Sequence, residues 1–102
     1  MQILDSIRIG GVDYSLNRHP VLNNGEVMLY GQVDYLQCRI DINTGYNRQL
    51  QYITLLHEIL HVLLHNADIN LGEEEEEIID TCARGMYQVL VDNQTLICAK
   101  EG

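Results

Sequence analysis

The stretch LLHEILHVLLHNA, Leu55–Ala67, sets the fold of this chain. It is an apolar segment in which histidine recurs at every fourth position, at 57, 61 and 65. Residues four apart lie one turn apart on the same face of an α-helix. Apolar side chains at helical spacing precede this stretch from Tyr46 onward, and no proline interrupts them. The spacing therefore predicts a helix over residues 46–66.

A second helix is predicted directly after the first. The polar segment DINLG at 68–72 is long enough only for a turn. Helical spacing then resumes in the glutamate run at 73–77 and continues through IIDTCARGMYQVLVDN at 78–93. Because the connection is short, we expect the two helices to pack as antiparallel neighbours. The tail QTLICAKEG at 94–102 fits either a last short strand or an unpaired end.

The first 45 residues alternate as strands do. SIRIGGVDYSL at 6–16 alternates apolar and polar residues on both sides of a Gly-Gly pair, which predicts a hairpin. Pro20 and the Asn24-Gly25 pair interrupt regular structure, and alternation returns in YLQCRIDI at 35–42. We expect one α+β domain spanning residues 1–102, with a small antiparallel N-terminal sheet followed by two packed helices.

Charge and composition exclude several kinds of partner. The formal net charge of -9 repels nucleic-acid phosphates. No apolar run approaches the roughly 20 residues that a membrane span requires, and the N-terminus lacks a secretory pattern. Cys38, Cys82 and Cys98 form no CxxC motif and indicate free, buried thiols in a reducing compartment. These features predict a cytoplasmic protein that acts without nucleic acid or membrane.

His57, Glu58 and His61 form an HExxH motif. On a helix the two imidazoles share a face, so both can bind one zinc ion at about 2.0 to 2.1 Å. Glu58 lies about 100° round from His57, where it can accept a proton from water without binding the metal. The alternative is a pair of hydrogen-bonded core histidines beside a solvent-facing glutamate. The surrounding helix favours the metal site.

A catalytic zinc requires a third protein ligand and an open position. His65 lies about 12 Å along the helix axis from His57, too far to bind the same ion. We expect His65 either to lie at the C-terminal end of the helix or to support a ligand without binding the metal. The second helix must therefore supply the ligand. Asp80 is the first candidate, and Glu76 and Glu77 remain alternatives.

The pattern leaves two further roles open on the second helix. Asp80 has the spacing to pair with Arg84 at the surface instead of binding metal. Glu76 and Asp80 can also have different roles, in which one carboxylate binds the metal and the other orients a histidine.

Two segments of the chain resemble the ImmA/IrrE family, the small zincin-like metallopeptidases of phages and mobile elements. They are TLLHEILHVLLH at 54–65 and DTCARGMYQVL at 80–90. The resemblance implies a minimal zincin-like fold with zinc as cofactor. It also implies His57, His61 and Asp80 as ligands, since Asp80 stands three residues before an alanine as the family's acidic ligand does, and Glu58 as catalytic base.

The resemblance further implies a protein or peptide substrate, because family members of known role cleave a repressor-type protein of the same cell. An extended substrate can pair with a sheet edge, and YLQCRIDI at 35–42 is the predicted edge. Two other hypotheses stay open. One is a non-catalytic zincin-fold binding module of phage or prophage origin, and the other is a structural zinc site with Cys82 as fourth ligand. The sequence does not fix the oligomeric state.

Overall fold

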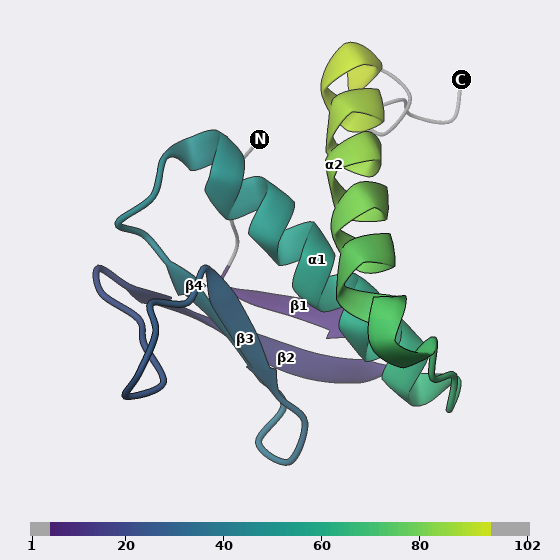
Figure 1. The fold of residues 1–102 in the computed structure, drawn as a ribbon, viewed down its shortest axis with the longest axis horizontal. Helices are drawn as coiled ribbons and strands as arrows, with labels where there is room; N and C mark the ends of the chain where they lie inside the picture. The colour runs from purple at the N-terminus through teal and green to yellow at the C-terminus, as the bar shows by residue number, and fades with distance from the viewer. Residues whose placement is uncertain (1–4, 95–102) are drawn as a thin grey trace.

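The computed structural model describes residues 5–94 as a mixed sheet followed by two helices (Figure 1). The elements in chain order are β1 (Ser6–Ile9), β2 (Val12–His19), β3 (Gly31–Asp34), β4 (Arg39–Asn43), α1 (Arg48–Asn66), the short 3₁₀ helix η1 (Gly72–Glu74) and α2 (Glu75–Asp92). The predicted α+β class, with the strands before the helices, is confirmed.

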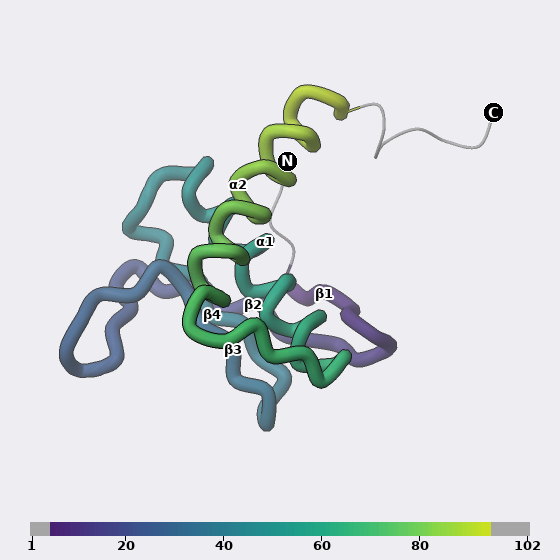
Figure 2. Tube along the Cα trace, turned by 45° about the vertical axis from the view of Figure 1, so that its right-hand side comes forward, coloured from purple at the N-terminus to yellow at the C-terminus, as the bar shows by residue number. Residues whose placement is uncertain are grey.

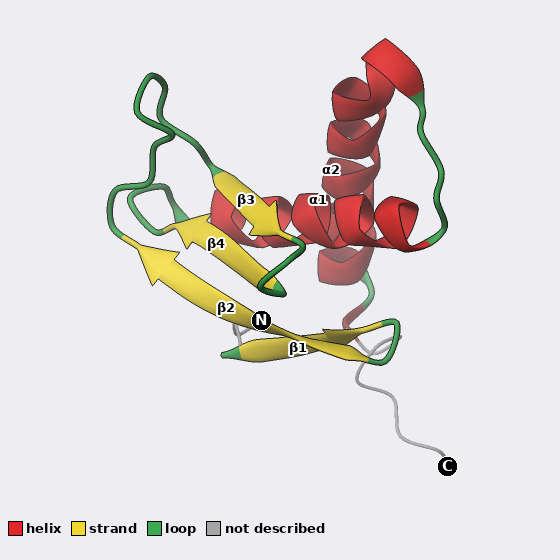
Figure 3. Cartoon of the chain, turned by 90° about the horizontal axis from the view of Figure 1, so that it is seen from below, coloured by secondary structure: helices red, strands yellow, loops and turns green. Residues whose placement is uncertain are grey.

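The sheet has four strands in the order β1-β2-β4-β3. β1 and β2 are antiparallel, as are β3 and β4, whereas β2 and β4 are parallel. The expectation of a wholly antiparallel sheet is therefore corrected at this one pair. Residues 20–30 carry the chain from β2 past the place where β4 will lie, so β4 returns between β2 and β3 in the direction of β2 (Figure 3).

The predicted hairpin at the Gly-Gly pair is confirmed between β1 and β2. Gly10 and Gly11 both have positive φ, at 59° and 82°. A two-residue turn of this kind needs positive φ at both positions, which glycine adopts without a steric penalty.

The predicted sheet edge at 35–42 is wrong. This segment contains most of β4, which lies inside the sheet between β2 and β3. Its side chains Ile40 and Ile42 are fully buried. Alternation of apolar and polar residues identifies a half-buried strand, but it does not distinguish a central strand from an outer one. The outer strands are β1 and β3.

α1 covers one face of the sheet and forms the core with it. Tyr14, Leu16, Ile40 and Ile42 on the strands pack with Val62 of α1. α2 then packs on α1 through side chains that include the buried Ile79 and Ala83, and the tube in Figure 2 shows both helices on the same side of the strands. The packing of the core therefore fixes the relative positions of α1, α2 and β3 where these elements approach one another.

Glycine at position 31 allows β3 to lie close to α1. A Cβ at Gly31 would stand 2.6 Å from Thr54 Cγ2 and 2.8 Å from the backbone oxygen of Asp41. Both separations are shorter than real Cβ contacts, so any larger residue would push the strand away from the helix.

No helix within residues 5–94 combines the length and apolar content needed to cross a bilayer. Cys38 and Cys82 are free thiols, the first half-buried and the second exposed. The prediction of burial is wrong for Cys82, because Ile79 and Ala83 occupy the packed face of α2. Cys98 and the tail from residue 95 onward, for which a last strand was considered, lie outside the described residues.

Candidate metal centre

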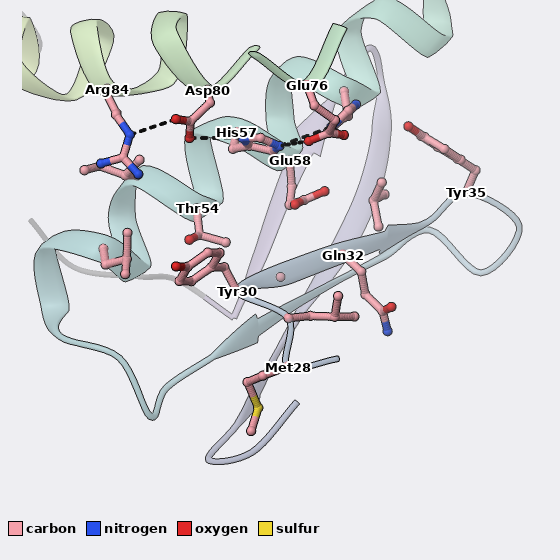
Figure 4. Close-up of a pocket in the computed structure, with 16 residues that line it drawn as sticks. Met28, Tyr30, Gln32, Tyr35, Thr54, His57, Glu58, Glu76, Asp80 and Arg84 are labelled. Atoms are coloured by element: carbon pink, nitrogen blue, oxygen red, sulfur yellow. Dashed lines mark hydrogen bonds and ion pairs between the residues drawn. The ribbon is translucent and has the colours of Figure 1, made fainter. Parts of the chain in front are cut away.

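A cleft of about 520 Å³ opens between β3 and α2, with α1 as its floor (Figure 4). Both predicted histidines and Glu58 line it from α1. Glu76, Asp80 and Arg84 line it from α2, at successive positions four residues apart. Such spacing places these three side chains along one face of that helix.

Two histidines and one carboxylate converge in the cleft. The Nε2 atoms of His57 and His61 lie 3.2 Å apart. One carboxylate oxygen of Glu76 is 3.0 Å from Nε2 of His57, and the other is 2.8 Å from Nε2 of His61. These side chains are the group in the described residues whose potential ligand atoms lie within 4.8 Å of one another.

Local structure explains this convergence. The N-cap Asn47 accepts a hydrogen bond from the Leu50 N–H at 2.8 Å, and α1 continues unbroken to Asn66. His57 and His61 therefore stay one turn apart on one face. Ile79 and Ala83, buried against α1, fix the rotation of α2 about its own axis so that position 76 faces the two rings.

The three side chains fit a tetrahedral zinc ion. Ligand atoms bound at about 2.0 to 2.1 Å in a tetrahedral arrangement stand about 3.3 Å from one another. The two Nε2 atoms are 3.2 Å apart, close to that value. The contacts of 3.0 and 2.8 Å to His57 and His61 are made by different oxygens of Glu76, and one atom from each of the three side chains lies within 4.8 Å of the others. Two imidazoles and one carboxylate also form a donor set known for catalytic zinc, which leaves one position open.

Glu58 lies beside this group and not within it. Its side chain projects from α1 into the space between the histidines and β3 (Figure 4). Only 6% of the residue is exposed. Burial, together with the negative charge of Glu76, raises the pKa of Glu58 from 4.5 to about 7. A carboxyl group with this pKa can exchange protons near neutral pH.

Asp80, the predicted third ligand, lies at the opposite edge of the His57 ring from Glu76. Its Oδ1 atom is 3.8 Å from Nδ1 of His57, and Oδ2 accepts a hydrogen bond from Nε of Arg84 at 2.9 Å. An ion bound by Nε2 of His57 would therefore lie beyond the reach of Asp80 in this arrangement. The geometry favours Glu76, an alternative from the sequence, as the ligand. Glu77 is exposed.

Glu75 stands behind the second histidine much as Asp80 stands behind the first. Its Oε2 atom is 3.7 Å from Nδ1 of His61, and Oε1 accepts a hydrogen bond from the Leu71 N–H at 3.1 Å. Sequence reasoning did not single out Glu75 from the glutamate run. The sequence predicted the turn at 68–72, but it did not show which glutamate side chain would accept a hydrogen bond from the turn's backbone, because that contact depends on how the turn meets α2.

His65 does not belong to the metal group. Its ring stacks on Tyr35, with ring centroids 3.8 Å apart and planes inclined by 13°. Tyr35, which the sequence did not indicate, follows β3 and lines the cleft. Burial and the charges of nearby glutamates, Glu58 first, raise the pKa of its hydroxyl group above 10.0. Tyr35 therefore stays protonated and able to donate a hydrogen bond.

The other predicted zinc arrangement, with Cys82 as fourth ligand, finds no support in these contacts. Cys82 is exposed and is absent from the lining of the cleft. The fold and the site together define an α+β domain with a His-His-Glu group and a buried glutamate at the open edge of its sheet. Comparison with protein-family models, curated proteins and solved structures gave no match.

Proposed function

We propose that this protein is a zinc-dependent peptidase that cleaves an extended segment of a protein substrate. The observation that carries the proposal is the convergence of His57, His61 and Glu76 on one point, with the buried carboxyl group of Glu58 beside it. Zinc bound there would supply a Lewis acid that polarises a carbonyl group and lowers the pKa of water.

The side chains supply the proton transfers. Glu58 takes a proton from water as the oxygen attacks the carbonyl carbon of the peptide bond, and it then passes that proton to the leaving amine. In the zinc-free chain the pKa of Glu58 is raised to about 7 by burial and by the charge of Glu76. A zinc ion bound beside Glu58 would lower this pKa and favour the ionised form that accepts the proton. Tyr35, from the opposite wall, presents a neutral hydroxyl group to the same cleft.

The edge of the sheet supports a peptide as substrate. β3 is an outer strand, and its residues Gly31, Gln32 and Val33 line the cleft. An extended peptide can add to such an edge through main-chain hydrogen bonds. Gly31 brings this edge close to α1, so the backbone of a paired peptide would pass near the histidines.

The resemblance of residues 54–65 and 80–90 to the ImmA/IrrE family adds to the proposal. It points to a cytoplasmic enzyme of phage or mobile-element origin, with a regulatory protein of the repressor type as substrate. The use of Glu76 in place of Asp80 would move the acidic ligand one helical turn from the position that the resemblance implies.

The test uses the purified full chain, loaded with zinc and freed of excess metal. Elemental analysis should find about one zinc per chain, and incubation with a proteome-derived peptide library should give defined cleavage products by mass spectrometry. Glu58→Gln should retain the zinc and reduce cleavage by about 10²- to 10⁴-fold, because an amide cannot accept the proton. Glu77→Gln, an exposed position on α2, is the matched control.

Three results would contradict the proposal in different ways. Absence of zinc would remove the metal centre. Loss of zinc in Glu58→Gln would make Glu58 a ligand instead of the base. Bound zinc with no cleavage of any peptide would leave the alternative from the sequence, a non-catalytic binding module.

A further inference from the structure

One side of α2 is uncharged and exposed. The helix packs on α1 through a different side, which includes Ile79 and Ala83. Four exposed residues, spaced three or four apart, follow the outer side of the helix: Ile78, Cys82, Gly85 and Val89. The two large members, Ile78 and Val89, are 39% and 51% exposed. We call these four residues the outer stripe of α2.

The outer stripe faces away from the metal group. Successive residues of a helix lie about 100° apart, so Ile78 and Val89 lie about 160° to 180° round α2 from Asp80. Asp80 lines the cleft, and the residues of the outer stripe do not. The end of α2 stands clear of α1 and of the sheet in both Figure 1 and Figure 2. A partner on the outer stripe would therefore leave the cleft open.

The absence of charge on the outer stripe indicates the chemistry of its partner. The chain has a formal net charge of -9, and the glutamate run at 73–77 lies at the start of the same helix, yet the stripe itself contains no charged residue. Charged residues are depleted at the centre of protein interfaces. A basic partner would find no charge to pair with there, so the matching surface is apolar.

The sizes of the side chains along the stripe read the same from either end. Ile78 and Val89 are large, and Cys82 and Gly85 between them are small. The midpoint falls between residues 83 and 84, which is also the midpoint of α2 (Glu75–Asp92). A two-fold interface brings a surface against itself. A second α2 in the opposite direction would therefore place large residues against large ones and small against small.

Gly85 has no role in the packing of the described chain. No atom of residues 5–94 lies within 4 Å of a Cβ added at this position. Glycine inside a helix is less stable than alanine, so the fold of one chain gives no reason for it. Between two helices, a missing side chain lets the axes approach, because their distance depends on the side chains at the contact.

We propose that two copies of this protein associate through the outer stripe, with their α2 helices antiparallel about a two-fold axis. Charge selects the direction. A parallel pair would bring the two glutamate runs at 73–77 together, whereas an antiparallel pair separates them by the length of the helix. Because one helix from each copy forms the contact, the interface is small and the dimer depends on concentration. This inference does not rest on the proposed function.

The first measurement is sedimentation of the full zinc-loaded chain over a series of concentrations. The average mass should rise with concentration from 11.7 kDa, the mass of one chain, toward twice that value. Added salt should strengthen the association, because it screens the repulsion between two chains of net charge -9.

A matched pair of variants tests the stripe. Val89→Glu should weaken association at least about 10-fold, because it places a charge in an apolar contact. Val91→Glu makes the same change two positions along the helix, at a residue that is 38% exposed. Val91 lies about 200° round from Val89, so this control should leave association unchanged. Both variants should bind zinc as the wild type does, which shows that the fold is kept.

Gly85→Leu separates a close contact from general apolar adhesion. Leucine favours a helix and meets no atom of the described residues at this position, so the single chain should stay folded. It adds apolar surface, which would strengthen non-specific association. In the proposed interface it holds the helices apart, and association should weaken at least about 10-fold.

Disulfide formation tests the direction of the helices. The background is a chain carrying Cys38→Ala, Cys82→Ala and Cys98→Ala. In it, Ile78→Cys mixed with Val89→Cys should form a linked dimer on oxidation. Val89→Cys alone should not, because the two copies of this residue would lie about 16 Å apart along an antiparallel pair, too far for a disulfide.

Each possible failure overturns a stated part of the proposal. The mass of one chain at every concentration would overturn the dimer, and a loss of thermal stability of that monomer in Val89→Glu would assign the stripe to an occupant within the same chain. A linked dimer of Val89→Cys alone would overturn the antiparallel direction. Stronger association of Gly85→Leu would overturn the close approach of the two helices.

Discussion

Histidine meets carboxylate in two regions of this molecule, and the two regions differ in what balances the negative charge. On β4, Asp41 alternates with the buried Ile40 and Ile42, so its side chain lies on the sheet face away from α1. It contacts His19 at 2.9 Å, Gln32 at 3.0 Å and Arg39 at 3.3 Å. Every contact offers Asp41 a donor or a positive charge.

In the cleft the same residue types meet without such compensation. Glu76 contacts the two histidines, while Arg84, the arginine that lines the cleft, is paired with Asp80. Nε2 of each histidine faces both Glu76 and the other ring. Two neutral imidazoles whose Nε2 atoms face each other at 3.2 Å cannot both donate from Nε2 to Glu76 without a clash between their hydrogens, and a bound cation would satisfy all three side chains. The comparison teaches that the balance of hydrogen-bond donors, more than residue type, distinguishes the Asp41 cluster from the candidate metal group.

The largest expected effect concerns zinc. Glu76→Ala should weaken zinc binding by more than about 100-fold, since it removes the proposed ligand, whereas Asp80→Ala should weaken it by about 10- to 100-fold, as loss of a carboxylate behind a histidine does. Asp41→Ala should leave affinity unchanged. Titration against a competing chelator measures all three.

The ranking of these variants decides between the two candidate ligands. A larger loss for Asp80→Ala than for Glu76→Ala would restore the ligand that the sequence favoured. A large loss for Asp41→Ala would break the comparison, because it would mean that the cluster on the open face also binds metal.

The next effect concerns Glu58 in the zinc-free protein. Its pKa is raised from 4.5 to about 7, so the folded chain holds this proton more tightly than the unfolded chain. The stability of the zinc-free protein should therefore fall as pH rises from about 4.5 to 7 and then level off. Glu58→Gln cannot ionise, and it should be more stable than the wild type by about 3 kcal/mol at pH 8.

Urea unfolding at pH 5 and pH 8, with chelator present, measures this difference. The advantage of Glu58→Gln should fall to less than about 1 kcal/mol at pH 5, where the carboxyl group of the folded wild type is largely protonated. An equal advantage at both pH values would show that the effect comes from packing and not from a buried charge.

The smallest effect concerns Asp41. Burial alone would raise its pKa, but hydrogen bonds from Gln32 and His19 and the charge of Arg39 lower it below 3.8. Asp41→Ala should cost about 2 kcal/mol of unfolding free energy at pH 7, because it removes several partners at once. Asp34→Ala, whose ion pair with Arg39 at 3.7 Å is half-exposed, should cost less than about 1 kcal/mol.

The loss of stability in Asp41→Ala should depend on pH. Ionised Asp41 stabilises the folded state above pH 3.8, and that contribution is lost as pH falls through its lower folded pKa. The deficit of Asp41→Ala should therefore shrink in acid. A deficit that stays constant from pH 7 to pH 2.5 would show that the carboxylate charge is not what holds the open-face cluster together.

Helical spacing settled the part of the site that lies within one element. His57, Glu58 and His61 could be placed from the sequence, because a single regular helix fixes which residues share a face and which is turned aside. The hairpin at Gly10 and Gly11 was predictable for the same reason, since its geometry depends only on neighbouring residues.

Side-chain positions that depend on how two elements pack together could not be predicted from the sequence. Glu76 and Asp80 lie one turn apart on the same face of α2, and the pattern is equally compatible with either facing the histidines. The longitudinal position of α2 on α1, set by the packing of Ile79 and Ala83, brings Glu76 to both rings. A shift of one turn, about 5.4 Å, would have brought Asp80 there instead.

The sequence by itself determined the HExxH helix, the helix that follows it, the strand-rich beginning and the acidic character of the chain, because each of these is a property of local spacing or composition. Only the tertiary structure decided that β4 lies inside the sheet, that β3 is the free edge beside the cleft, and that Glu76 completes the group of possible ligands. These features join residues far apart in the chain, and their positions follow from how the core packs, which no single stretch of sequence records.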